Sequence, residues 1–236
     1  MPEVKVTLSA NAGVCIEVGE KRIWVDAQYE GADVGFSRMS TALQQQVLDS
    51  EAFARPDHIV YTHCHPDHYS RELASISAKR WGSAKLYLPE QELEGQVLLN
   101  GDEIQFTDQD LQLRFLRLPH AGPQYADVKL YGLIISVPGC NILLPGDCEV
   151  ASPVLAKAIG DTRIDLAILD FPWITLRGGR AFVESHIRPD HVLAYHLPFA
   201  EDDHNGYRQA SSKAAKSMEK DVRLLLEPMQ TEIIKI

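Results

Sequence analysis

The sequence predicts a layered α/β fold in which short strands dominate and a helix follows several of them. Apolar, β-prone runs recur along most of the 236 residues, and stretches with helical spacing separate some of them. Six of these runs end in an Asp or a His, namely Asp26, His63, His120, Asp147, Asp170 and His196. Strand ends at one edge of a sheet can place such side chains in a common cleft. The pattern therefore also indicates a metal site assembled from distant segments.

The first half of the chain contains four expected strands and two expected helices. The strands are expected over the runs 4–9, 13–18, 22–25 and 58–61. Helical spacing covers about 40–53. A second helix is expected to begin at Pro66 and to run to about Lys79, because proline suits the first position of a helix and Asp67 suits the positive end of its dipole.

The second half continues the same alternation. Strands are expected at 111–118, 142–144, 164–169 and 192–195, and the turn or residue after each carries one of the six Asp and His residues. A helix near 207–220 and two further strands at 222–226 and 231–236 complete the expected order. The mixture of strands and following helices favours packed layers over a helical bundle.

Length and composition agree with a single folded domain over residues 1–236. Hydrophobic residues make up 45% and charged residues 24%, which allows a sizeable buried core. The first residues lack the features of a signal peptide, and no stretch approaches the roughly 20 apolar residues that cross a bilayer. The four cysteines form no disulfide pattern, so a cytoplasmic protein is expected.

The charge of the chain argues against a nucleic-acid partner. The formal net charge is -10, and the 23 basic residues are scattered along the sequence. Phosphate binding requires clustered Lys and Arg side chains. A nucleic-acid partner is therefore not favoured, no membrane partner is expected, and the expected partner is a small-molecule substrate.

The strongest functional signal is a dense motif, His63-x-His65-x-Asp67-His68. In an extended segment His63 and His65 point to the same side, so the two imidazoles can hold one cation together. Asp67 and His68 follow a proline bend and face a neighbouring position. Four donors in six residues exceed what one open catalytic ion takes from a protein, so the motif indicates two ions. Imidazole and carboxylate donors suit zinc best, and also iron or manganese.

Several other residues are weaker ligand candidates. His58 and His191 each begin an apolar run, whereas His186 and His204 lie in polar, loop-like surroundings, so none of the four is expected to bind a metal. Cys64 and Cys148 flank candidate ligands, and both are expected to be buried neutral thiols, because Cys148 should point away from its neighbour Asp147. Asp170 is expected to be a turn residue.

The motif Thr62-His63-Cys64-His65-Pro66-Asp67-His68 resembles the signature loop of the metallo-β-lactamase superfamily. The resemblance continues in order along the chain, with Pro119-His120, Gly146-Asp147 and Tyr195-His196 each after an apolar strand. The segments 11–17 and 23–26 resemble the opening strands and first acidic residue of the family. Among its branches, the short chain is most similar to the small sugar-phosphate lactonases.

The resemblance implies an αββα sandwich of two mixed sheets, with the metal site at one edge. It implies one metal bound by His63, His65 and His120. A second would be bound by Asp67, His68 and His196. Asp147 would bridge the two metals, and Asp26 would orient a ligand histidine, as metal-bound imidazoles generally require.

The activity implied is that of a metal-dependent hydrolase. A hydroxide bridging the two metals would attack an ester-type bond (a lactone, phosphodiester or thioester) of a small anionic substrate. Asp67 is the candidate proton acceptor, because it can bind a metal with one oxygen and steer the water with the other. Tyr125 and Tyr195 are considered as proton donors to the leaving group, although tyrosines in such places more often only pack.

Two alternatives from other classes stay open. The first is a di-iron redox protein on the same fold. The flavodiiron relatives typically carry a carboxylate at the position of His65 and use a flavin domain for which this chain has no segment. The second is a metal-binding protein without turnover, against which the complete set of seven candidate ligands argues.

Overall fold

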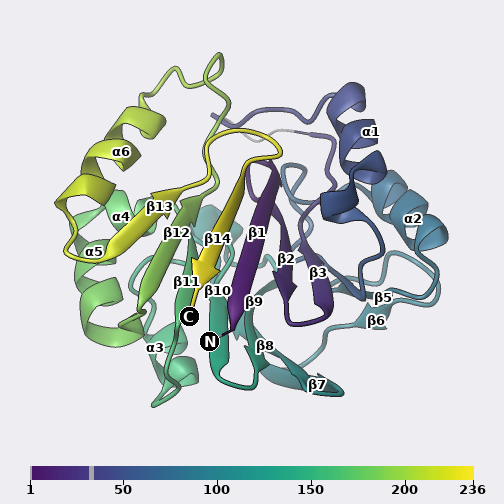
Figure 1. The fold of residues 1–236 in the computed structure, drawn as a ribbon, viewed down its shortest axis with the longest axis horizontal. Coiled ribbons are helices and arrows are strands. Elements are labelled where there is room, and N and C mark those ends of the chain that lie inside the picture. The colour runs from purple at the N-terminus through teal and green to yellow at the C-terminus, as the bar shows by residue number, and fades with distance from the viewer. Residues whose placement is uncertain (1, 32–34) are drawn as a thin grey trace.

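Two seven-stranded sheets form the centre of the computed structural model, which describes residues 2–31 and 35–236 (Figure 1). The two sheets pack face to face, and helices cover the outer face of each (Figure 1). The order of layers is therefore helix, sheet, sheet, helix, which confirms the predicted αββα sandwich. No helix in the described ranges is long and apolar enough to span a membrane.

The first sheet places the residues after β3 and β4 at the same edge. β3 pairs in parallel with β4, and Val25 lies opposite Val60. The backbone N–H of Asp26 then donates to the carbonyl of Val60 at 2.9 Å, so Asp26 lies beside the start of the histidine motif. In spatial order the strands of this sheet are β14 (Thr231–Lys235), β1 (Glu3–Ala10), β2 (Gly13–Val18), β3 (Lys21–Val25), β4 (His58–Val60), β5 (Lys85–Leu88) and β6 (Val97–Leu98).

The second sheet is antiparallel on one side and parallel on the other. β10, β11, β12 and β13 run parallel, so their carboxyl ends share one edge and carry Asp147, Asp170 and His196. In spatial order the strands are β13 (Asp221–Leu224), β12 (His191–Tyr195), β11 (Leu166–Asp170), β10 (Cys140–Leu144), β9 (Leu130–Val137), β8 (Leu111–Leu118) and β7 (Glu103–Asp108).

Three apolar cores hold the layers together. The central core lies between the sheets and includes Val6 and Ile16 from the first and Phe115 and Leu133 from the second, all fully buried. The other two cores lie between each sheet and its helices. The helices are α1 (Thr41–Asp49), α2 (Arg71–Arg80), α3 (Pro153–Ile159), α4 (Pro172–Thr175), α5 (Arg177–Phe182) and α6 (Tyr207–Ser217), with single turns η1 (Glu51–Phe53) and η2 (Pro123–Tyr125) and a π-turn η3 (Val183–Ile187).

The predicted start of the second helix at Pro66 is wrong. The helix α2 begins at Arg71, because the hydroxyl of Ser70 accepts the backbone N–H of Leu73 and caps the first turn. Residues 65–69 instead form a tight turn, in which the N–H groups of His68 and Tyr69 both donate to the carbonyl of His65. Asp67 therefore lies in a turn and not at the positive end of a helix.

Other predicted elements differ in extent. The expected helix over 40–53 is divided, since α1 ends at Asp49 and a separate turn η1 follows Ser50. The expected helix 207–220 ends three residues early, at Ser217. Strands β5, β6, β7 and β9 and helices α3 to α5 were not predicted.

Candidate metal centre

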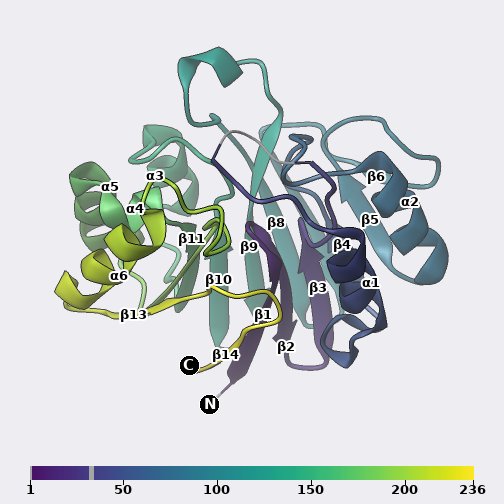
Figure 2. The same cartoon turned by 90° about the horizontal axis from the view of Figure 1, so that it is seen from above.

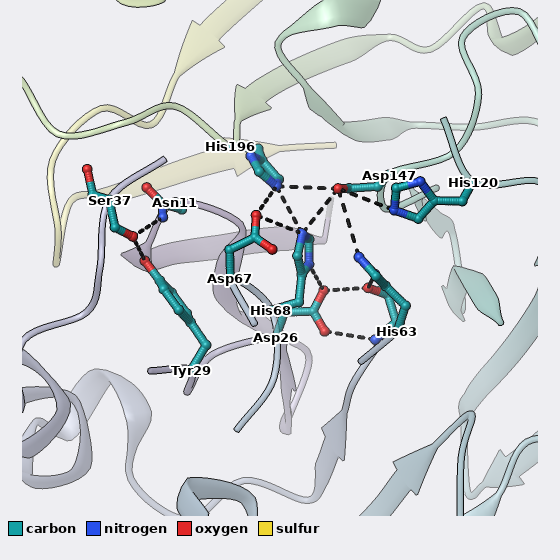
Figure 3. A network of polar contacts seen from close by, with 11 residues as sticks. Asn11, Asp26, Tyr29, Ser37, His63, Asp67, His68, His120, Asp147 and His196 are labelled. Carbon is teal, nitrogen blue, oxygen red and sulfur yellow. Dashed lines mark hydrogen bonds and ion pairs between the residues drawn. The ribbon is translucent and has the colours of Figure 1, made fainter. Parts of the chain in front are cut away.

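Seven Asp and His side chains meet where four strands end. His63, His65, Asp67 and His68 lie in the loop after β4, which belongs to the first sheet. The other three follow β8, β10 and β12 of the second sheet, namely His120, Asp147 and His196. Figure 3 shows the side chains of six of the seven turned toward one another, with the Asp147 carboxylate in the middle.

The donor atoms form three overlapping groups that could each hold a metal ion. In each group the donor atoms lie within 4.8 Å of one another; the groups are His63, His65 and His120; His63, His68 and Asp147; and Asp67, His68 and His196. The structure therefore brings together all seven residues that the sequence predicted as ligands.

Asp147 lies between the histidines of both sides. Its Oδ2 is 3.3 Å from His68 Nε2, 3.9 Å from His120 Nε2 and 4.0 Å from His63 Nε2. Its Oδ1 is 3.5 Å from His196 Nε2. This central place agrees with the bridging position implied by the family resemblance.

Asp26 supports two of the histidines from beneath. Its Oδ2 accepts from His68 Nδ1 at 2.9 Å and from the hydroxyl of Thr62 at 2.6 Å, and its Oδ1 accepts the Thr62 backbone N–H at 2.8 Å. Thr62 Oγ1 is also 3.0 Å from His63 Nδ1. Both residues are fully buried, so a single carboxylate fixes His68 directly and His63 through Thr62 (Figure 3).

These contacts decide which nitrogen of each ring carries a proton. The Thr62 hydroxyl has one hydrogen, which it donates to the Asp26 carboxylate, so its oxygen accepts the Nδ1–H of His63. His120 Nδ1 likewise donates to the carbonyl of Ala121 at 2.8 Å. The Nε2 atoms of His63 and His120 are therefore lone-pair donors, as a metal ligand requires.

Three buried donor atoms at the centre have no hydrogen-bond partner within the described part of the chain. They are Nε2 of His63, Nε2 of His120 and Oδ1 of Asp147. A buried polar atom without a partner is costly, and most such atoms in folded proteins are satisfied. Cations bound within the donor groups would give these atoms partners. The donor set of five imidazoles and two carboxylates therefore fits divalent transition metals.

Burial and the charges at the centre shift the pKa values of two histidines in opposite directions. Burial, together with the nearby His68, lowers the pKa of His63 well below its usual range. Burial alone would also lower the pKa of His68, but the carboxylates of Asp147 and Asp26 outweigh it and raise that pKa well above its usual value. Conversely, His68 and His196 overcome burial and hold the pKa of Asp147 well below its usual range. Without a metal, His68 carries the proton that balances Asp147.

The four histidines that were not expected to bind a metal make other contacts. His58 and His191 lie at the opposite ends of their strands, where they contact Tyr87 and Asp221. His186 stacks on Phe182. His204 is exposed, with its backbone N–H on the carbonyl of Asp202.

Both cysteines beside candidate ligands have raised pKa values, which favour the neutral thiol. Burial raises the pKa of Cys64 to about 12, and it raises the pKa of Cys148 well above its usual value. Cys148 is fully buried in the helix-side core of the second sheet, as expected, whereas Cys64 is only half-buried.

Asp170, which was expected to be a turn residue, is the buried last residue of β11. It is 9% exposed at the end of β11, and one of its oxygens has no hydrogen-bond partner among the described residues. Burial and the nearby negative charge of Asp147 raise the pKa of Asp170 well above its usual value. Asp170 is therefore harder to ionise than an ordinary aspartate, in part because of Asp147.

Sequence reasoning missed the supporting role of Thr62 and the position of Phe36. The ring centroid of Phe36 lies 4.2 Å from that of His196, in an edge-on arrangement. Thr62 directly precedes His63 in the sequence. Its support of the His63 ring depends on the direction of its hydroxyl group, which the sequence does not show. Nothing in the local sequence indicates the Phe36 contact, because 160 residues separate the two rings (196 − 36).

Comparison with known proteins gives the family. Residues 21–201 match the family model described as the beta-lactamase superfamily domain. No curated protein matches the chain. Igni18, a metallo hydrolase from Ignicoccus hospitalis, is 18% identical with a TM-score of 0.67 over 99% of both chains.

Two further solved structures share the fold. CmlA, a diiron beta-hydroxylase from Streptomyces venezuelae, is 15% identical with a TM-score of 0.64 over 99% of this chain and 54% of its own. An isothiocyanate hydrolase from Delia radicum gut bacteria is 16% identical with a TM-score of 0.64 over 97% of this chain and 98% of its own. The family match includes every residue of the metal centre, and the chain belongs to the beta-lactamase superfamily.

Proposed function

We propose that the protein is a metal-dependent hydrolase that uses two divalent cations to cleave an ester-type bond of a small molecule. The observation that carries the proposal is the cluster of buried, unpartnered donor atoms around the Asp147 carboxylate. The bond is a lactone, phosphodiester or thioester bond, all of which suit the same chemistry. Free thiols at all four cysteines support a cytoplasmic site of action.

Each ion would be held by donors from both sheets. In this proposal His63, His65 and His120 hold the first, and Asp67, His68 and His196 hold the second. Asp147 contacts the histidines of both sets and therefore binds between them. Zinc suits this mixture of nitrogen and oxygen donors best, with iron and manganese as alternatives.

When bound, the cations supply Lewis acidity, which lowers the pKa of water and polarises the bond under attack. The protein side chains supply orientation and proton transfer. Asp67 is the proposed proton acceptor. It is 3% exposed, and its Oδ2 lies 3.8 Å from His196 Nε2 and 3.9 Å from His68 Nε2, which leaves the other oxygen to accept a proton from water.

The variant Asp67→Asn tests this role. The amide keeps the size of the side chain but loses the charge and the ability to accept the proton. We expect kcat to fall by about a hundredfold to ten-thousandfold with measured metal occupancy kept equal. Asp26→Asn should cost about ten- to a hundredfold, because Asp26 only orients ligands. An Asp67→Asn protein that retains both metals and near wild-type turnover would refute the proposed proton acceptor.

Turnover and metal content test the function as a whole. Zinc-loaded protein should bind about two equivalents and hydrolyse at least one class in a panel of lactones, phosphodiesters and thioesters. Two bound ions without turnover on the panel would favour the non-catalytic alternative. Because CmlA, a diiron beta-hydroxylase, shares the fold, a visible iron absorption band in the isolated protein would favour the redox alternative.

A further inference from the structure

A cavity of about 310 Å³ opens directly beside the proposed first metal position. Its wall includes His65 and the neighbouring Cys64 on one side. On the other side lies the loop 119–129, which contains η2 and projects beyond the ends of the sheets in Figure 2. The volume is at the lower end for ligand pockets, so the cavity suits one small substituent and not a large molecule.

Tyr125 connects this cavity to the metal centre. Its ring centroid lies 4.8 Å from that of His65 and 4.9 Å from that of His120, in edge-on and tilted arrangements. A group bound in the cavity would thus contact Tyr125 and lie beside two proposed ligands. A substrate held at the proposed metals could therefore place its non-reacting side in this cavity.

The charges of the cavity wall do not suit an anion. Two carboxylates, Glu90 and Asp127, face one ammonium, Lys129. Lys129 Nζ is 3.2 Å from Glu90 Oε2, so its charge is already paired. An incoming carboxylate or phosphate would have to displace Glu90 and approach Asp127.

The remaining wall is uncharged. Cys64 contributes a half-buried thiol to it. Val128 and the ring of Tyr125 add apolar surface. Such a wall favours an uncharged, partly apolar group.

We propose that this cavity binds an uncharged side group of the substrate and that the Glu90–Lys129 pair selects against substrates that carry an anion there. The inference rests on the proposed hydrolase function and specifies its substrate class. It replaces the anionic substrate expected from the sequence. The metal cations would still attract the polar bond under attack, since the selection concerns only the group remote from that bond.

The test compares two esters that differ only at the end of the acyl chain. The probes are p-nitrophenyl butyrate, which ends in a methyl group, and p-nitrophenyl hemisuccinate, which ends in a carboxylate. Zinc-loaded wild-type protein should show the higher kcat/KM for butyrate. Glu90→Gln frees Lys129, so the ratio of hemisuccinate to butyrate kcat/KM should rise by about two- to fivefold, the range of an exposed ion pair.

The matched control is Glu94→Gln. Glu94 is exposed in the same segment and is not part of the cavity wall, so the variant removes the same charge without freeing Lys129. The ratio should stay at the wild-type value in this control. Lys129→Gln should lower the ratio, because it leaves the carboxylates unopposed. An unchanged ratio in Glu90→Gln, or an equal rise in Glu94→Gln, would overturn the proposal.

A binding experiment separates this proposal from the hydrolase proposal. Pentanamide and succinamate are inert amides of similar size, and calorimetry with zinc-loaded protein measures their affinities. Tighter binding of pentanamide, reversed or reduced in Glu90→Gln, supports the cavity inference even if no ester is hydrolysed. Ester hydrolysis together with tighter binding of succinamate to the wild type would refute the cavity inference and leave the hydrolase proposal standing.

Discussion

Single residues at the candidate metal centre divide into proposed ligands and residues that support them. The sequence predicted the seven side chains that meet there, because their types and their positions after apolar runs are local features of the chain. It also predicted Asp26 as a support. It did not predict that Thr62 passes this support to His63, because the direction of a hydroxyl depends on atoms brought together by folding. Nor did it predict the burial of Asp170.

His68 should release a proton when a metal binds. Its pKa in the metal-free protein is raised, so its contribution to stability is present below pH 6.5 and is lost as pH rises through the raised value. A metal binds the neutral imidazole. Zinc affinity should therefore increase as pH rises from 6.5 through the raised pKa of His68. Calorimetry in two buffers of different ionisation enthalpy measures the protons released at pH 7.

The variant Asp26→Asn tests whether the released proton comes from His68. It removes one of the two carboxylates that raise the pKa of His68, so the variant should release fewer protons per zinc. Asp161→Asn changes an exposed aspartate far along the sequence from the motif and should release the wild-type number. Equal release from Asp26→Asn and wild type would show that the proton is held elsewhere.

At the scale of single elements, the segment from His63 to α2 shows how local signals compete. Pro66 and Asp67 are typical of a helix start, yet the helix begins at Arg71 because Ser70 provides the cap. Residues 65–69 form a turn that directs Asp67 and His68 to the centre. The sequence alone could not decide whether the helix begins at Pro66 or at Arg71, because both positions have suitable residues. The contacts that decide it join Asp67 and His68 to distant segments.

Ser70→Ala should lower the free energy of unfolding by about 1 kcal/mol, because it removes the N-cap of α2. Ser40→Ala removes the equivalent cap of α1 and should cost a similar amount. Only Ser70→Ala should also weaken zinc binding, since Ser70 lies two residues after His68. Urea unfolding of the metal-free variants and zinc titration measure the two effects. Equal zinc affinity in the two variants would contradict a link between α2 and the motif.

For the whole molecule, the sequence predicted the layers through the family resemblance, and the structure confirms them. It could not assign strands to sheets from pattern alone. β9 is almost fully buried, so it lacks the alternation that marks a strand with one exposed face. β14 pairs with β1, which is a contact between the two ends of the chain that no local signal encodes.

Removing the metals should destabilise the entire fold, because the proposed ligands come from both sheets and ions would join them. At a free zinc concentration a thousandfold above Kd, binding to the folded state adds about 4 kcal/mol. For a chain of this length, that corresponds to a rise in Tm of about 10 °C. Thermal unfolding with zinc and with a chelator measures the shift.

Two histidine variants make the stability test specific. His196→Gln removes a proposed ligand and should reduce the zinc-dependent shift. His186→Gln changes an exposed histidine that stacks on Phe182 and should preserve it. A chelator that leaves Tm unchanged, although the untreated protein holds two ions, would contradict the link between the sheets.

The pairing of β1 with β14 has a consequence for how the protein is made. Strand β1 gains one of its two neighbours only after residues 231–235 have been synthesised, as the contact between Thr7 and Thr231 across 224 positions shows. Until then one edge of β1 offers unpaired backbone groups to any other nascent strand. His196 is the last of the proposed ligands in the sequence, so the second proposed metal set is complete only after β12 has been synthesised. The arrival of β14, and not the initial collapse, is therefore the step that completes the first sheet.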